Sequence, residues 1–323
     1  MRRLLVAGVT GMLALTAVVY GAGSANAAAY PNPGVVTGST GAHDPTMVKR
    51  PTGGYLLATT GDGITLKTSP NRTAFTDAGK AFPNGTPWAS SYTGGSAHLW
   101  APDVSYRNGK YWMYYSASTF ESSKSAIFLA TSTTGTSGSW THVGKVIEST
   151  TTSGWNAIDP NLTVTPSGEW WLTFGSFWTG IKMVKLNAST GLRADSTLRA
   201  IAERFTNSKS VEAPFIHYRN GYYYLFMSFD FCCRGASSTY RTMVARSTSI
   251  TGPYRDRAGT LATAGGGTEI LAAHDGIRGP GHPAVFTDSD ADVLVYHYYT
   301  SSGAARLGIN LLGWDSSAWP YVY

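Results

Sequence analysis

Three carboxylates are placed so that they could do chemistry together, because each lies in a repeated short phrase built around a proline. Asp44 and Asp159 each directly precede a proline, and Glu212 precedes Pro214 by two residues. Carboxylates clustered in a partly desolvated site cannot all ionise freely, so their pKa values separate. A raised carboxyl group can then serve as a general acid and an ionised one as a base, which glycoside hydrolysis requires. The alternative interpretation is that these side chains cap strand starts or bind a cation.

The carboxylates can act together only if the fold brings their phrases together, and the phrases repeat in a way that predicts this. Five prolines spaced 54 to 69 residues apart each precede an alternating apolar stretch, a turn and an aromatic-rich or apolar strand. These steps lie within or just above the periods of propeller blades. Two of the turns are Asn-Gly, the strongest short-range hairpin signal. The phrases begin at Asp44-Pro45, Ala101-Pro102-Asp103, Asp159-Pro160, Glu212-Ala213-Pro214 and His282-Pro283.

A further strand-like segment follows each of these hairpins. The segments span residues 64–68, 126–131, 181–186, 242–247 and 307–312, and they alternate or run apolar over strand length. We therefore predict an all-β fold, a five-bladed β-propeller whose inner strands begin at one central channel. A β-sandwich with long loops is the alternative, but sandwiches do not repeat a proline-turn-aromatic phrase at this spacing.

The N-terminus resembles a secretory signal. Arg2 and Arg3 form a short basic region, residues 4–20 are apolar, and residues 25–27 read Ala-Asn-Ala, an A-x-A cleavage site. A membrane anchor is the alternative, but the glycines and the small-residue exit favour cleavage. We expect residues 1–27 to be a signal peptide and residues 28–323 to form a single propeller domain. The mature protein is then exported, monomeric and free of the membrane.

The composition argues against some classes of binding partner. The net charge is +6, and the basic residues are scattered without a run of five or more. This argues against a nucleic-acid partner. Aromatic residues make up 13% of the chain and charged residues 14%, which suits a densely packed β body with aromatic grooves.

The only two cysteines, Cys232 and Cys233, are adjacent. Because an exported protein meets an oxidising environment, two free thiols would be unusual. We predict a vicinal disulfide, with free or intermolecular sulfurs as the alternatives. Adjacent cysteines cannot staple distant segments, so the bond would rigidify a local turn, and such constrained turns tend to lie near functional sites.

Seven short motifs stand out, at residues 42–45, 99–103, 158–161, 174–178, 211–214, 231–235 and 279–282. They resemble those of glycoside hydrolase family 43 and, within it, the α-L-arabinanases. The resemblance extends from about Ala42 to the C-terminus. It implies a five-bladed propeller, an inverting mechanism and the 1,5-linked arabinan of pectin as substrate, cut by endo action. An exo-acting arabinanase, an arabinofuranosidase or a xylosidase is the enzymatic alternative, and a non-catalytic polysaccharide-binding propeller is the alternative from another class.

The resemblance also implies roles for single residues. Asp44 corresponds to the general base that activates water, Glu212 to the general acid, and Asp159 to a third carboxylate that orients Glu212 and keeps its pKa high. The counterpart of His282 holds a cation on the propeller axis, usually calcium with a largely water shell. By its residue type alone, a lone histidine is more often a core group, and calcium prefers oxygen ligands.

Aromatic side chains in loops or at strand ends offer flat surfaces for a sugar ring. Asn156 and Ser176 are placed to bond sugar hydroxyls, although each can equally cap a turn. His43, beside the expected base, is either structural or a substrate contact. The residues expected to bind substrate are Trp100, Phe120, Trp155, Asn156, Ser176, Phe177 and Trp178.

Overall fold

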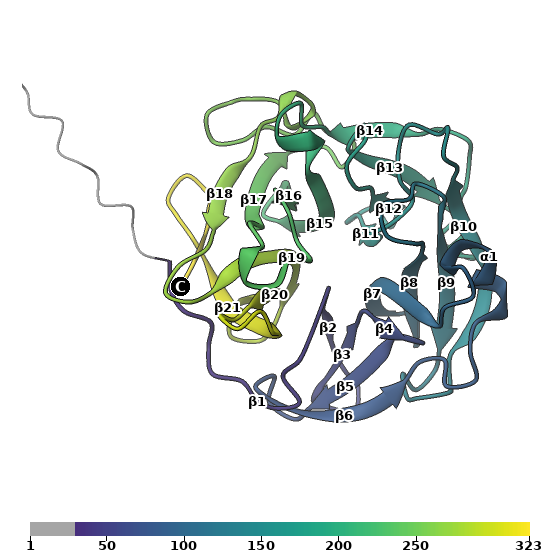
Figure 1. The fold of residues 1–323 in the computed structure, drawn as a ribbon. Coiled ribbons are helices and arrows are strands. Elements are labelled where there is room, and N and C mark those ends of the chain that lie inside the picture. Colours follow the sequence, from purple (N-terminus) through teal and green to yellow (C-terminus); the bar gives the residue numbers. More distant parts are fainter. Residues whose placement is uncertain (1–29) are drawn as a thin grey trace, which may run out of the picture.

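Five β-sheets surround a central axis like the blades of a propeller (Figure 1). The computed structural model describes residues 30–323, so the expected signal peptide, residues 1–27, lies outside the described residues. The sheets contain four or five strands, and all pairings are antiparallel except that of β1 with β6. The predicted all-β, five-bladed propeller is confirmed.

The blades follow one another along the chain. Blade 1 contains β2 (Thr46–Lys49), β3 (Tyr55–Thr59), β5 (Thr65–Ser69), β6 (Ala74–Lys80) and β1 (Thr37–Gly38). Blade 2 contains β4 (Gly61–Asp62), β7 (His98–Arg107), β8 (Lys110–Ala117), β9 (Ser125–Ser132) and β10 (Thr141–Ser149). Blade 3 contains β11 (Asn161–Val164), β12 (Trp170–Phe174), β13 (Ile181–Leu186) and β14 (Arg199–Ala202). Blade 4 contains β15 (Val211–Arg219), β16 (Tyr222–Phe229), β17 (Arg241–Ser247) and β18 (Thr268–Leu271). Blade 5 contains β19 (Arg278–Thr287), β20 (Asp292–Tyr299), β21 (Ala305–Trp314) and β22 (Pro320–Val322).

The predicted strands agree with this order. The five segments expected to follow the first hairpins correspond to β5, β9, β13, β17 and β21. Both Asn-Gly turns have positive φ at their two central residues, 53° and 77° at Asn108 and Gly109, and 47° and 87° at Asn220 and Gly221. This is the backbone of a type I′ turn, whose twist matches that of the flanking strands. Helical structure in residues 30–323 is limited to α1 (Ser90–Thr93) and short 3-10 turns at Pro87–Ala89, Asn207–Lys209, Gly235–Ser237 and Ala262–Ala264.

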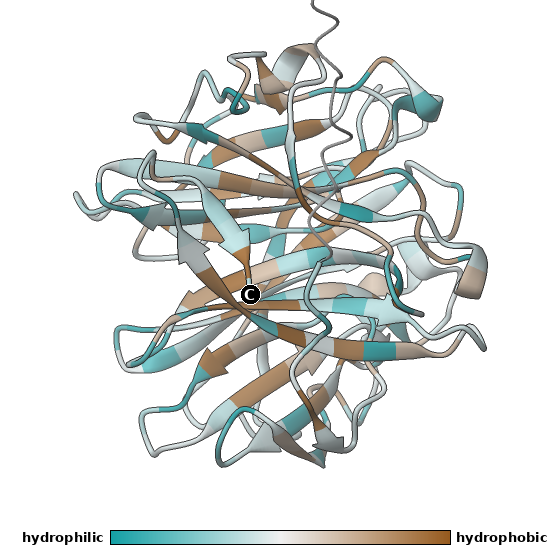
Figure 2. Ribbon diagram, turned by 90° about the vertical axis from the view of Figure 1, so that its left-hand side faces the viewer, coloured by the Kyte–Doolittle hydropathy of each residue, from teal (hydrophilic) through white to brown (hydrophobic). Residues whose placement is uncertain are grey.

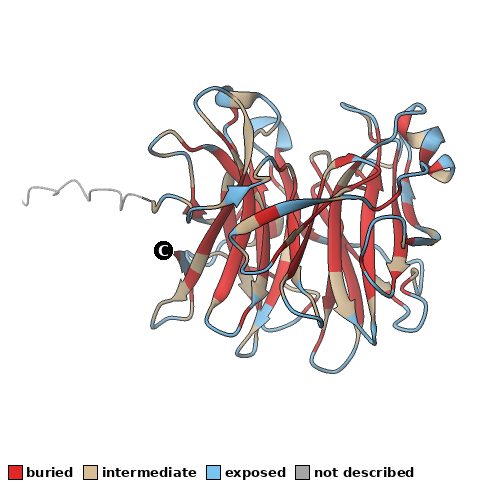
Figure 3. Ribbon diagram, turned by 90° about the horizontal axis from the view of Figure 1, so that it is seen from below, coloured by how far each residue is buried: buried red, intermediate tan, exposed pale blue. Residues whose placement is uncertain are grey.

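The hydrophobic core lies between neighbouring blades. The apolar residues lie mainly along the strands (Figure 2), and these strands are largely buried while the loops at their ends are exposed (Figure 3). Leu56 of blade 1, for example, shares a cluster with Met113 and Phe128 of blade 2. Full burial of such a side chain stabilises the fold by about 1.5–3 kcal/mol. Aromatic residues within strands belong to this core: Tyr114 and Trp171 are only 0% and 6% exposed.

The segment before β2 connects the last blade to the first. The Gly34 N–H donates to the Ile309 carbonyl at 2.8 Å, and the Leu307 N–H donates to the Thr40 carbonyl at 2.9 Å. Strand β1 then pairs with β6, the outer strand of blade 1. The ring is therefore tied where its two ends meet, which fixes blades 1 and 5 around the channel.

Within residues 30–323, no helix has the length and apolar character needed to span a membrane.

Candidate active site

The residue before each of the five repeated prolines has a left-handed backbone. The φ angles lie between 46° and 58° at Asp44, Ala101, Asp159, Ala213 and His282. Sterics make this region rare for residues other than glycine, and a following proline restricts the backbone further. Such a conformation costs on the order of 1–3 kcal/mol and persists only where the surroundings enforce it.

Hydrogen bonds from side chains hold these five positions. In four cases the backbone N–H donates to an uncharged side chain at or just after the second strand of the preceding blade. In the fifth case the Ala213 N–H donates to the carboxylate of Asp159 instead. The pairs are Asp44 with His297 Nδ1 at 3.1 Å, Ala101 with Thr60 Oγ1 at 2.8 Å, Asp159 with Ser116 Oγ at 3.0 Å, His282 with Ser228 Oγ at 2.8 Å, and Ala213 with Asp159 Oδ2 at 3.1 Å.

The irregular backbone aims side chains into the channel. Register shifts interrupt the first hairpin of blades 2, 4 and 5 at this point, between Trp100 and Asp103 in blade 2 and between Glu212 and Phe215 in blade 4. Bulges of this kind re-aim side chains next to active sites. The result is a cavity of about 510 Å³, called here the carboxylate pocket, whose lining includes His43, Asp44, Thr60, Asp159, Glu212, Tyr240 and His282. The predicted convergence of the strand starts is therefore observed.

Asp44 is buried among hydrogen-bond donors. The Thr60 hydroxyl donates to Asp44 Oδ2 at 2.6 Å, and His43 Nδ1 lies 2.9 Å from the same oxygen. His282 Nδ1 lies 3.1 Å from Oδ1. Burial by itself would raise the pKa of Asp44, but the facing His43 and His282 rings hold it well below its ordinary value. Asp44 is therefore an ionised carboxylate at neutral pH.

His297 is the third imidazole beside Asp44, and it plays a different part. Its Nδ1 accepts the Asp44 N–H at 3.1 Å, so the proton of the neutral ring is on Nε2. Burial, followed by the nearby His43 and His282, keeps the pKa of His297 well below its ordinary value. The 3.5 Å approach of Nδ1 to Asp44 Oδ1 is therefore no ion pair, because that nitrogen carries no proton.

This arrangement leaves one acceptor position of Asp44 open. A carboxylate has about four lone-pair positions, two on each oxygen. Thr60 and His43 occupy those of Oδ2, and His282 occupies one of Oδ1. The remaining lone pair of Oδ1 is the one that can accept a proton from water.

Glu212 has the opposite electrostatic setting. The Ser176 hydroxyl donates to Oε2 at 2.6 Å, and the Tyr240 hydroxyl donates to Oε1. Burial raises the pKa of Glu212, the charge of Asp44 adds to this shift, and the two hydroxyl hydrogen bonds oppose it. Glu212 can therefore hold a proton at a pH where Asp44 cannot.

Asp159 interacts with both of the other carboxylate-bearing segments. Its Oδ2 accepts the N–H of Ala213, the residue that follows Glu212, and so fixes the backbone that carries Glu212. Burial raises the pKa of Asp159 to about 8, with His282 opposing the shift and the charges of Glu212 and Asp44 adding to it. Two buried carboxyl groups that influence each other titrate as a pair. The pair therefore retains a proton near neutral pH.

A longer groove continues from the carboxylate pocket past Glu212. This aromatic groove has a volume of about 670 Å³, and it shares Trp100, Phe120, Glu212 and both cysteines with the pocket. Phe120 is 70% exposed, so its ring is free to meet a ligand. Six of the residues expected to bind substrate line the groove: Trp100, Phe120, Asn156, Ser176, Phe177 and Trp178.

Trp155 does not line either cavity. Its ring meets that of Phe174 edge-on, with 5.6 Å between centroids, at the border of the core cluster between blades 2 and 3. Asn156 also has a structural partner, because its Oδ1 accepts the Ser125 hydroxyl at 2.6 Å. Trp155 therefore lies outside the groove, although Asn156, the next residue in the sequence, lines it.

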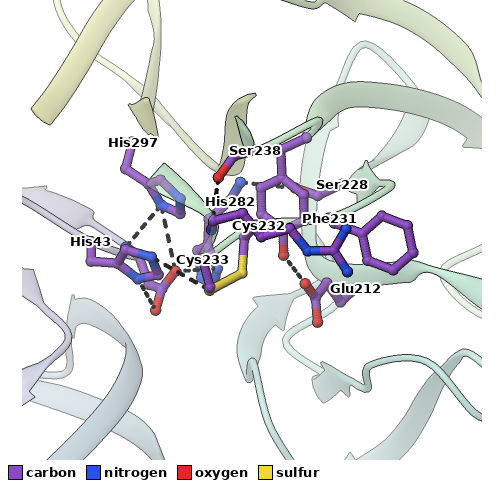
Figure 4. Close-up of a disulfide and its surroundings, with 12 residues drawn as sticks. His43, Glu212, Ser228, Phe231, Cys232, Cys233, Ser238, His282 and His297 are labelled. Atoms are coloured by element: carbon purple, nitrogen blue, oxygen red, sulfur yellow. Dashed lines mark hydrogen bonds and ion pairs between the residues drawn. A yellow bond between two sulfur atoms is a disulfide. The ribbon is translucent and has the colours of Figure 1, made fainter. Parts of the chain in front are cut away.

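The structure contains the predicted disulfide between Cys232 and Cys233. Both cysteines line the pocket and the groove. In the view of Figure 4, His43 and His297 lie on one side of the disulfide, and Glu212 and Phe231 on the other. The constrained turn therefore forms part of the site, as its position in the sequence suggested.

Four residues that contact the carboxylate-bearing residues or His43 were not predicted: Thr60, Tyr240, His297 and Tyr299. They lie away from the proline phrases, and no motif singles them out. His297 alone leaves a signal, since a histidine directly after the apolar, buried run from 293 to 296 needs a polar partner.

Asp103 belongs to a proline phrase but does not enter the carboxylate pocket. It follows its proline instead of preceding it, and its Oδ2 accepts the Leu162 N–H at 2.7 Å. Burial raises its pKa to about 6. Asp103 lines a separate cavity farther along the inner strands. Asp103 therefore lies outside the carboxylate cluster.

A propeller with converging carboxylates of opposite pKa shift and an aromatic groove has the features of a polysaccharide hydrolase. The family model described as "Glycosyl hydrolases family 43" matches residues 30–320. The chain therefore belongs to this family, which confirms the resemblance seen in its motifs.

Individual relatives support the same assignment. The chain is 44% identical over 284 residues to an "Extracellular endo-alpha-(1->5)-L-arabinanase 1" of Bacillus subtilis (strain 168), covering 86% of each chain. It is 36% identical to an "Extracellular exo-alpha-(1->5)-L-arabinofuranosidase ArbA" of Cellvibrio japonicus (strain Ueda107), covering 87% of this chain and 86% of the relative. Among solved structures, the "GH43 Endo-Arabinanase from Bacillus licheniformis" superposes with a TM-score of 0.84 at 42% identity, covering 89% and 99%.

Proposed function

We propose that this protein is a secreted, monomeric endo-arabinanase that hydrolyses internal 1,5-α-L-arabinofuranosidic bonds of arabinan. One observation carries the proposal: the carboxylate pocket holds two buried carboxyl groups whose pKa values are shifted in opposite directions, Asp44 downward and Glu212 upward. The names of the relatives supply the substrate class and the extracellular location. An endo mode is supported by the printed name of the relative that is 44% identical and by the aromatic groove that shares Trp100, Phe120 and Glu212 with the carboxylate pocket.

The proposed reaction follows from the opposite pKa shifts of Asp44 and Glu212. Glu212, protonated, donates to the oxygen of the departing sugar, while Asp44 Oδ1 accepts a proton from the water that attacks the anomeric carbon. Asp159 positions the backbone of Glu212 and helps the pair to retain its proton. Because Asp44 acts on water and forms no bond to the sugar, the product has inverted configuration. We expect the carboxyl groups of Asp44 and Glu212 to be separated by about 6.5–9.5 Å, the spacing of inverting enzymes.

We further propose that His282 binds a cation, with calcium expected. Its Nδ1 faces Asp44 at 3.1 Å, which leaves only Nε2 as a ligand. The protein would therefore contribute one imidazole, and water would supply the oxygen ligands that calcium prefers. A bound cation would supply positive charge that lowers nearby carboxyl pKa values and orders water. Two other sets of metal-ligating atoms occur in residues 30–323, His43 with both cysteines and His43 with Asp44 and His297, but the disulfide sulfurs and the Nδ1 of His297 already have other partners.

Product analysis on debranched arabinan tests the substrate and the mode of action. Early release of a ladder of oligomers is the expected result. A single small product from the start would indicate an exo-acting arabinanase. Cleavage only of aryl arabinosides or xylosides would indicate an arabinofuranosidase or xylosidase on this scaffold. Binding of arabinan without hydrolysis would indicate a polysaccharide-binding propeller.

Proton NMR of the first products tests the stereochemistry. The inverted anomer should appear first and then mutarotate. Retained configuration, or a glycosyl group trapped on Asp44, would exclude the inverting mechanism.

A further inference from the structure

The disulfide turn is connected to Asp44 by a continuous path of hydrogen bonds. The Cys233 N–H donates to the Tyr299 hydroxyl oxygen at 2.9 Å. That oxygen lies 2.7 Å from His43 Nε2, and His43 Nδ1 lies 2.9 Å from Asp44 Oδ2. Tyr299 is only 4% exposed, and Ser238 is the other side chain within hydrogen-bond reach of its hydroxyl. Neither Tyr299 nor the cysteines have a role in the reaction proposed above.

The directions of these hydrogen bonds follow from Asp44, because an ionised carboxylate can only accept and His43 Nδ1 must therefore donate to it. The Tyr299 oxygen accepts the Cys233 N–H, and its own proton can point to His43 Nε2. Nε2 is then an acceptor, and the neutral ring carries its proton on Nδ1. Nδ1–H faces an ionised carboxylate, which favours the same tautomer. The opposite tautomer would aim a lone pair of Nδ1 at Asp44.

The disulfide constrains the first donor of this path, the Cys233 N–H, because it closes a ring around that peptide group. The ring closed by Cys232 and Cys233 contains the peptide group between them, and the N–H of that peptide is the one that donates to Tyr299. Closing the ring therefore restricts the rotation of this donor. Without the bond, the same N–H would belong to a turn whose Cys233 is exposed.

The turn is also anchored to the body of blade 4. Asp230, which precedes it by two residues, accepts from Arg204 at 2.6 Å and from Arg241 at 2.7 Å. The Thr239 N–H donates to the Phe231 carbonyl at 2.8 Å and closes the other side of the turn. Both ends are therefore fixed, so the position of the Cys233 N–H is set relative to the blades that carry His43 and Asp44.

We propose that the Cys232–Cys233 turn and Tyr299 are positioning elements that hold His43 in its Nδ1–H tautomer, directed at Asp44 Oδ2. With Oδ2 occupied by His43 and Thr60, only Oδ1 is left to accept a proton from water. The proposal rests on the role of Asp44 in the function proposed above. It explains why a vicinal disulfide lies in the wall of the site although it links no distant segments.

Tautomer measurement tests the proposal without using activity. Protein labelled with ¹⁵N-histidine is studied by long-range ¹H–¹⁵N correlation NMR, and the His43 signals are assigned by their loss in His43→Asn. We expect His43 to carry its proton on Nδ1 in the wild type and to lose that preference in Tyr299→Phe. Tyr298→Phe, a change at the neighbouring residue of β20, is the control and should leave the His43 signals unchanged. A His43 that is Nε2–H or doubly protonated in the wild type, or unchanged in Tyr299→Phe, would overturn the proposal.

Kinetics with arabinan provide the second test. Tyr299→Phe should lower kcat about five- to tenfold, the effect of one hydrogen bond, with KM nearly unchanged. In His43→Asn the side-chain amide keeps a donor toward Asp44 but cannot reach Tyr299, so adding Tyr299→Phe to it should have no further effect. A Tyr299→Phe effect of the same size in both backgrounds would show that Tyr299 acts on stability instead of through His43.

The disulfide itself is tested with Cys232→Ser/Cys233→Ser. This variant should shift the His43 tautomer and kcat in the same direction as Tyr299→Phe, and the two changes should not add. An unaltered tautomer and kcat in the folded double-serine variant would remove the disulfide from the proposal. If wild type shows no arabinanase activity but the tautomer behaves as expected, the function assigned to Asp44 fails and the positioning proposal stands.

Discussion

Asp44 and Glu212 lie in the same pocket and are almost equally buried, with exposures of 9% and 7%, yet their pKa values are shifted in opposite directions. Asp44 faces two imidazoles and a hydroxyl. Glu212 has two hydroxyl donors and no positive partner within ion-pair distance among the described residues. Burial penalises both charges, so the partners decide which carboxyl group keeps its proton. The base and the acid are thus distinguished by the side chains that face their carboxyl groups and not by depth.

The largest effect is expected from Asp44→Asn. Replacing the ionised carboxylate removes the only group that can accept the proton of the attacking water. General-base contributions are typically about 10²–10⁴-fold, and activity should fall by at least that much on arabinan and equally on an aryl arabinoside. Initial rates on both substrates measure this, with a thermal melt to show that the variant is folded. Activity that persists on the aryl substrate would contradict the assignment of the base.

Glu212→Gln should separate the two substrates. Without the proton donor, activity on arabinan should fall by several orders of magnitude, whereas an aryl arabinoside, whose leaving group needs little protonation, should retain more. The ratio of kcat/KM on the two substrates is the measurement. If the variant kept more than a tenth of the activity on polymer, Glu212 would not be the acid.

Tyr240→Phe sharpens the comparison by changing only the setting of Glu212. The Tyr240 hydroxyl stabilises the charged form of Glu212 and so opposes the rise in its pKa. Its removal should raise that pKa and move the basic limb of the pH–rate profile to higher pH by about one unit, the size expected for a hydrogen bond to a charged group. Ser176→Ala, which removes the donor to the other oxygen, should shift the limb in the same direction. A basic limb that moves down or stays in place in both variants would mean that these hydroxyls do not tune the acid.

The smallest effect is expected for the proposed cation. Metal bound only to the folded protein stabilises it by about 2.7 kcal/mol at a concentration 100-fold above its dissociation constant. Excess chelator should therefore lower the melting temperature of the wild type, while His282→Ala should barely respond. Elemental analysis before and after dialysis is the direct measurement. If thoroughly demetallated wild type and His282→Ala melt and turn over alike, and no calcium is detected, His282 is a core histidine.

The sequence by itself determined the fold and the main side chains of the site. Regular spacing of proline phrases predicts blades, because each hairpin must bury its apolar faces against the next one. The same spacing places Asp44, Asp159 and His282 at equivalent points directly before a proline, with Glu212 one residue earlier in its own phrase, and equivalent points of propeller blades converge on the channel. The adjacent cysteines also predict their own disulfide, since no other cysteine is present in the chain.

Only the tertiary structure decided what surrounds these side chains. Thr60, His297 and Tyr299 reach Asp44 or His43 from second strands or just after them, and the sequence gives no spacing rule for such contacts. Trp155 and Asp103 show the same limit from the other side. Asn156 and Trp100 line the cavities, whereas Trp155, one residue before Asn156, and Asp103, three residues after Trp100, do not. Backbone periodicity is local and can be read along the chain. The direction of a hydrogen bond and the pKa of a side chain depend on groups a few ångströms away, many of them in other blades. Only the closed propeller therefore determines them.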